Sequence, residues 1–149
     1  EIMELRERPK SDYLHQASDE ELYVLAKHWQ SDMEFYRDEI RFLGNLLDKY
    51  FIWLVKDENI SHIQKLANTL SVMRNQHKNL FESIKSHIQH LQNRLTKPHA
   101  DDKSFRDAHA GLEDDIANFV KSLRNLKKEL FSATERVIEE ERLKRLLTP

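Results

Sequence analysis

The sequence contains no cysteine, and only two glycines and three prolines occur among its 149 residues. Without cysteine the chain has no disulfides, no thiolate nucleophile and no cysteine-ligated zinc or iron–sulfur cluster. Scarce glycine and proline leave few places for turns, whereas a β-rich fold needs many. We therefore expect a few long elements, and the absence of cysteine favours a cytoplasmic location.

Excess positive charge and long apolar runs are also missing. The net charge of −2 gives no general attraction to nucleic acid or to anionic lipid. No run approaches the roughly 20 apolar residues that a transmembrane helix requires. No basic-then-apolar stretch of the signal-peptide kind opens the sequence. We therefore expect neither nucleic acid nor a membrane as a partner.

A regular apolar stripe runs through the first long segment of the chain. Its residues recur at alternating spacings of four and three, which places them on one face of a helix that packs against other helices. Ser18 and Glu21 have the spacing of a capping box, which would start this helix at about Asp19. The stripe consists of Ala26, Trp29, Met33, Tyr36, Ile40, Leu43, Leu47, Tyr50 and Leu54.

Two later stripes of the same period predict two more helices of similar length. Short loops force consecutive helices to run antiparallel. Residues 1–17 are predicted to form a short N-terminal arm, and residues 18–149 are predicted to form a single helical-bundle domain. The alternative is a four-helix bundle, completed by the arm or by dimerisation. The fold predicted is an all-α, antiparallel up-down-up bundle of three long helices, over 19–55, 61–96 and 104–147.

The end of the first predicted helix is apolar on every side. A helix that is hydrophobic all round must be covered by something, and aromatic residues beyond those a core stripe needs suggest an interface. We therefore predict an interface with a protein partner or with a second copy in a homodimer. Cover by the arm or by the carboxy-terminal turn of the same chain is the alternative. The predicted interface residues are Tyr50, Phe51, Trp53 and Val55.

Histidine is abundant, with eight residues in the chain. In the antiparallel register, each helix brings two imidazole or carboxylate side chains to the same level, at spacings that share a face. Groups of this kind converging from facing helices can hold zinc or iron. In the competing interpretation, His87 and His109 are core residues bonded to nearby carboxylates, while His28 and His90 lie in solvent. The candidate metal ligands are His28, Asp32, His87, His90, His109 and Glu113.

Two single residues interrupt the predicted core stripes. His77 lies in the middle of the second stripe and needs a hydrogen-bond partner, for which Glu39 is the nearest candidate in the expected register. Gly111 either weakens its helix by about 1 kcal/mol relative to alanine or permits a neighbouring helix to approach closely.

The sequence has no nucleophile elbow, no glycine-rich phosphate loop and no recognisable order of catalytic residues. Acid and base pairs within one helix are too common in a chain this charged to indicate catalysis. We therefore expect a non-catalytic helical bundle that acts through protein–protein contacts or self-association, and no enzyme. A metal-binding bundle is the alternative.

Overall fold

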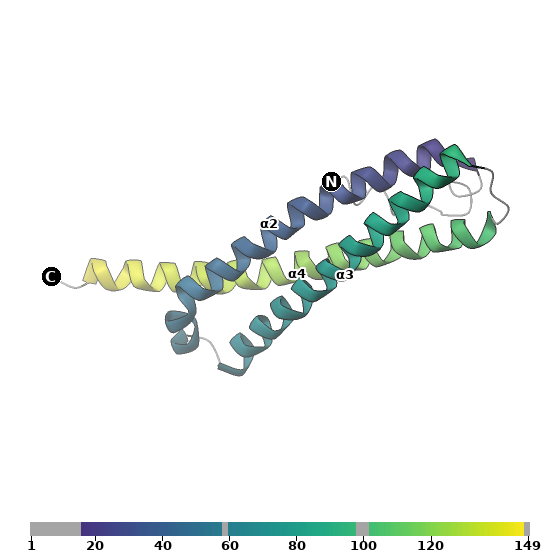
Figure 1. Cartoon of the computed structure of the whole chain (residues 1–149). Helices are drawn as coiled ribbons and strands as arrows, with labels where there is room; N and C mark the ends of the chain where they lie inside the picture. The colour runs from purple at the N-terminus through teal and green to yellow at the C-terminus, as the bar shows by residue number, and fades with distance from the viewer. Residues whose placement is uncertain (1–15, 58–59, 98–101, 148–149) are drawn as a thin grey trace. The chain divides into compact units, whose positions relative to one another are not determined.

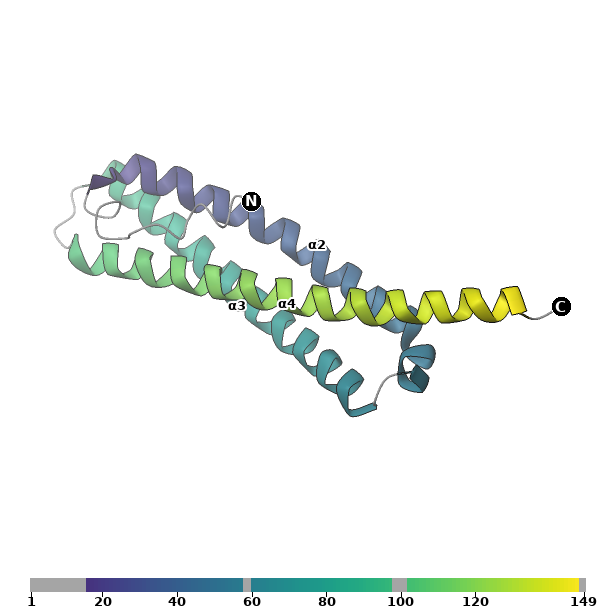
Figure 2. The same cartoon turned by 180° about the vertical axis from the view of Figure 1, so that it is seen from behind.

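A computed structural model describes residues 16–57, 60–97 and 102–147, and it is all-α (Figure 1). The chain runs through α2 (Asp19–Asp57), α3 (Ile60–Thr96) and α4 (Lys103–Leu147). Figure 2 shows the same three helices from behind, and the described residues include no strand. The predicted all-α fold of three long helices is therefore confirmed, with each helix boundary within two residues of its predicted position. Most of the predicted arm lies outside the described residues.

The start of α2 is the capping box that the sequence predicts. The Ser18 backbone N–H donates to Glu21 Oε1 at 2.9 Å, and the Glu21 N–H donates to Ser18 Oγ at 3.1 Å. Hydrogen bonds from the backbone and the side chain of Ser18 to the Glu21 carboxyl hold the pKa of that carboxyl below its usual range. Two N–H groups that the first turn would leave unsatisfied are therefore paired reciprocally.

The described residues fall into two compact units, and each helix contributes to both. The first unit takes Gln76–Lys121 together with the described residues up to Tyr36. The second takes Arg37–Asn75 together with the described residues from Ser122 onward. Whether residues 18–149 behave as the single predicted domain stays a prediction.

Each unit has its own buried core, built from the predicted stripes. In the first unit the largest fully buried side chains include Leu22, Trp29 and Met33 of α2. In the second unit they include Leu43 and Leu54 of the same helix. Among the stripe residues of α2, only Tyr50 is not buried. Burying a side chain of this size stabilises the fold by roughly 1.5–3 kcal/mol, so the stripe provides much of the stability of both units.

Contacts across α2 and α3 show the antiparallel pairing within each unit. In the first unit, Asp19 near the start of α2 bonds to Arg94 near the end of α3. In the second unit, Gly44 lies against the side chains of Arg74 and Leu70. Both pairings follow from the two-residue gap between the helices, because so short a connection leaves no other orientation.

The predicted partner of His77 is wrong. His77 Nε2 contacts the backbone carbonyl oxygen of Met33, and the ring packs beside Phe81 and Phe119. Glu39 instead bonds to Lys127, with Lys127 Nζ 2.8 Å from Glu39 Oε1. Met33 lies about two turns nearer the start of α2 than the level expected for His77, because periodicity alone fixes the offset between two helices only coarsely.

Candidate functional site

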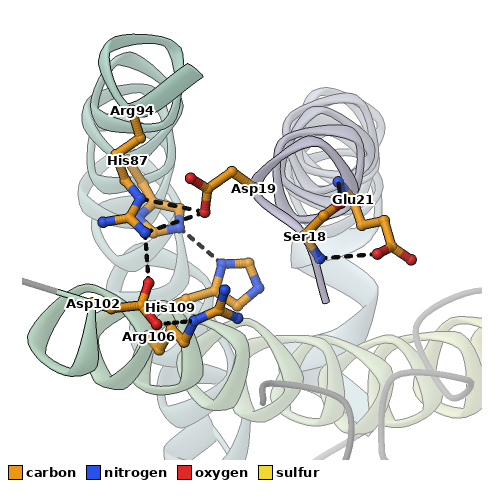
Figure 3. Close-up of polar contacts among 8 residues, drawn as sticks. All are labelled: Ser18, Asp19, Glu21, His87, Arg94, Asp102, Arg106 and His109. Atoms are coloured by element: carbon orange, nitrogen blue, oxygen red, sulfur yellow. Dashed lines mark hydrogen bonds and ion pairs between the residues drawn. The ribbon is translucent and has the colours of Figure 1, made fainter. Parts of the chain in front are cut away.

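A buried layer of aromatic and imidazole rings lies in the first unit, with one ring from each helix at its centre. His87 of α3 and His109 of α4 are buried, and His87 Nε2 lies 2.9 Å from His109 Nδ1 (Figure 3). The Trp29 ring of α2 lies 4.6 Å from the His109 ring, centre to centre. On the other side, Phe105 stacks on His87 at 4.9 Å. The two histidines thus form a hydrogen-bonded pair enclosed by aromatic rings.

This environment keeps both imidazoles neutral. Burial, together with the nearby charge of His90, lowers the pKa of His87 to about 4. Burial also lowers the pKa of His109 to about 3, with further contributions from His87 and Arg106. A hydrogen bond between two imidazole nitrogens needs one donor and one acceptor, so the accepting ring must be neutral. Near pH 7 the pair therefore consists of two imidazoles joined by one hydrogen bond, at least one of them neutral.

A network of ion pairs covers the layer next to Phe105. Arg94 Nη2 lies 3.2 Å from Asp19 Oδ1 and 2.6 Å from Asp102 Oδ1 (Figure 3). The Arg94 guanidinium also stacks over the Phe105 ring, with its central carbon 4.2 Å from the ring centre. Arg106 Nε adds a bond of 2.7 Å to Asp102 Oδ2. These bonds, the one from Arg106 first, hold the pKa of the Asp102 carboxyl below its usual range. The network thus links the start of α2, the end of α3 and the start of α4.

The structure brings together only part of the predicted metal ligand set. His87, His109 and Glu113 are buried in the first unit, whereas His28 and His90 are exposed and Asp32 is half-buried. In the described ranges, no group of three or more His, Cys, Asp or Glu side chains could hold a metal ion. His87 and His109 bond to each other, a contact that the sequence did not predict. The zinc or iron site itself stays a prediction.

The predicted interface residues lie in the second unit, at the end of α2. Phe51 is exposed, Ile52 is 62% exposed and Trp53 is 39% exposed, whereas Tyr50 and Val55 are half-buried. Leu54, which belongs to the core stripe, is fully buried. The helix therefore buries one side of its apolar end and leaves the remaining large side chains in contact with water.

A groove of about 670 Å³ lies beside these residues, between α2 and α4. Its apolar lining includes Trp53 of α2 with Ile138 and Leu146 of α4. The Tyr50 ring lies 6.4 Å from the Trp53 ring, and Lys49 Nζ lies 5.5 Å above the Tyr50 ring. Four charged side chains complete the lining, and three of them are basic: Lys49, Glu141, Arg142 and Arg145. The groove thus combines an apolar lining with a mainly basic rim.

Sequence reasoning predicted the α2 wall of this groove as an interface, and it gave the carboxy-terminal turn, which supplies the α4 wall, as the alternative cover from the same chain. The signal for α2 was an excess of aromatic residues over the core stripe. On α4 the stripe breaks off after Val137, and residues 139–145 are almost entirely charged. Because periodicity assigns no face once a stripe has ended, the sequence did not single out Ile138 and Leu146 as residues that line a groove.

No protein-family model, no curated protein and no solved structure matches the chain. The function must therefore be argued from the two features just described, the enclosed histidine pair and the open groove. No described helix is both long enough and apolar enough to span a bilayer.

Proposed function

We propose that this protein is a non-catalytic interaction module that associates with itself through the apolar surface of its second unit. The observation that supports the proposal is the exposure of Phe51, Ile52 and Trp53 in succession beside the groove. Keeping apolar surface in water costs about 25 cal/mol per Å². Contiguous apolar patches of several hundred Å² therefore usually mark an interaction site.

The chemistry of the groove favours contact over catalysis. Among the described residues, its lining holds no histidine, serine or aspartate, and its charged groups stand among apolar side chains. The two histidines with strongly lowered pKa values belong to the first unit, where they bond to each other. A groove with an apolar centre and a polar rim has the composition of a protein–protein interface.

The same features support a protein as the partner, rather than nucleic acid or a membrane. The rim carries one acidic side chain among its three basic ones, and no aromatic row alternates with basic residues along α4. The net charge of −2 gives no general attraction to nucleic acid or to anionic lipid. The absence of cysteine fits a reducing compartment such as the cytoplasm.

Size-exclusion chromatography with light scattering tests the proposal. We expect the wild-type protein to elute with a mass above that of one chain and Trp53→Glu to shift it towards the monomer. Ile52→Glu should act in the same direction with less risk to folding, because this side chain is 62% exposed. Val24→Glu, at an exposed apolar position of the first unit, is the matched control and should leave the mass unchanged. A wild-type monomer that none of these substitutions alters would remove the proposal.

A further inference from the structure

The last ten described residues of α4 leave the core of the second unit. Val137 is buried, but every residue from Ile138 to Leu147 is exposed except the half-buried Glu141. Four of these residues are large and apolar, and the outermost two, Leu146 and Leu147, are 74% and 83% exposed. A helix that continues for almost three turns with apolar side chains in water presents a surface suited to a second helix. The four apolar residues are Ile138, Leu143, Leu146 and Leu147.

Charge along this segment changes sign once. Three consecutive acidic residues, Glu139–Glu141, are followed by three basic residues, Arg142, Lys144 and Arg145. Two ion pairs within the helix join residues of the two charged groups. Arg142 Nη1 lies 3.7 Å from Glu139 Oε1 and Lys144 Nζ lies 3.9 Å from Glu141 Oε1, and all four side chains are at least one-third exposed. Exposed pairs of this kind contribute about 0–1 kcal/mol.

We infer that two copies of the chain pair through residues 138–147 of α4, antiparallel about a twofold axis that passes between Glu141 and Arg142. This inference rests on the proposed self-association and names its contact surface and its orientation. In this register Glu139 lies level with Lys144 of the second copy, and Glu141 lies level with its Arg142. Because the axis makes the contact isologous, each ion pair occurs twice. A parallel pairing would instead set the two acidic segments against each other.

The same register accounts for the groove. In this register Leu146 of the second copy lies level with Val137 of the first copy and next to its Ile138. Ile138 and Trp53 line the groove of the first copy. Each copy would therefore place Leu146 over the α4 wall of the other copy's groove. The groove and the charge order, which involve the same segment of α4, are both consistent with one partner, a second copy.

Two charge-altered chains test the pairing. One carries Glu139→Lys, Glu140→Lys and Glu141→Lys, and the other carries Arg142→Glu, Lys144→Glu and Arg145→Glu. Each variant alone should lose at least about tenfold in dimer affinity, because like charges then face each other across the axis. An equimolar mixture of the two should form a heterodimer. A chain that carries all six substitutions should form a homodimer again, and circular dichroism should show unchanged helix content.

Disulfide trapping tests the orientation without altering these charges. The natural chain has no cysteine, so Arg136→Cys and Leu147→Cys each introduce a single thiol. Residue 136 lies level with residue 147 of the second copy in the proposed register. A mixture of the two variants should therefore give mainly the mixed disulfide. In a parallel pairing these two positions would be about 16 Å apart along the axis, and each variant would link to itself.

The possible failures are distinct. A wild-type monomer overturns both the proposed function and this inference. A wild-type dimer that Trp53→Glu disrupts, but whose charge variants do not recombine or whose disulfides form only between identical positions, overturns this inference alone.

Discussion

His87 Nε2 lies 2.9 Å from His109 Nδ1, and each of these buried imidazoles has its pKa lowered by burial. In the folded state His87 and His109 therefore take up protons only near pH 4 and pH 3, respectively. In the unfolded chain the same two side chains take up protons near pH 6.5. The unfolded state binds more protons over this interval, so stability falls as the pH falls below about 6.5.

We predict that the free energy of unfolding falls steadily as the pH falls from 6.5 towards 4, because the two imidazoles bind protons in the unfolded chain over this range but not in the folded state. Nearby charged groups, which include His90, Arg106 and the buried Glu113, will modify the slope. Urea unfolding at a series of pH values measures it. The variant His87→Leu/His109→Leu should lose most of this acid sensitivity, whereas His28→Leu, at an exposed position, should retain it. Equal slopes in wild type and double variant would refute the account of the pair.

Burial should decide how much each of two arginines in ion pairs contributes to the free energy of unfolding. Arg94 is 8% exposed and pairs with Asp19 and Asp102, whereas Arg41 is 69% exposed and lies 2.6 Å from Asp38. We expect Arg94→Ala to lower the free energy of unfolding by about 2–4 kcal/mol, since Asp19 loses a partner in a largely buried place. Arg41→Ala should cost less than about 0.5 kcal/mol. Chemical denaturation of both variants measures the difference, and equal losses would contradict it.

The two glycines should respond differently to alanine. A Cβ at Gly111 would meet nothing within 4 Å, so this glycine serves no close approach. Gly111→Ala should therefore stabilise the protein by about 0.5–1 kcal/mol, the helix propensity difference. A Cβ at the buried Gly44 would overlap the end of the Arg74 side chain, which would have to move. Thermal unfolding should show a clear gain for Gly111→Ala and a smaller gain or a loss for Gly44→Ala.

Metal analysis tests the alternative function. The nitrogens of His87 and His109 that face each other are engaged in one hydrogen bond, and His28 and His90 are exposed. Protein purified without a nickel column should therefore carry zinc, iron and manganese well below one equivalent per chain. One equivalent of zinc or iron, lost in His87→Leu/His109→Leu, would establish a metal site and contradict our assignment of the pair.

The fold was accessible from the sequence because its signals are local. The capping box at Ser18 and the stripe from Ala26 to Leu54 depend on spacing within one helix, and both appear as predicted. Which side chains meet between two helices depends instead on how far one helix is shifted along the other and on how each helix is rotated about its axis. An axial error of about two turns was enough to assign Glu39 to His77, whose contact is with Met33.

The candidate interface was accessible in part for the same reason. An all-round apolar helix end is visible in one segment, so Phe51 and Trp53 could be predicted as exposed. The opposite wall of the groove comes from a segment of α4 whose stripe has already ended. Whether this segment of α4 lines a groove depends on which helix packs beside it, and the local sequence does not determine that packing.

Self-association through the second unit is the central claim, and sedimentation equilibrium of the wild-type chain tests it most directly. With increasing protein concentration, we predict that the average mass rises from the 17.9 kDa of one chain towards twice that value. A constant mass of 17.9 kDa over the whole accessible concentration range would contradict the claim.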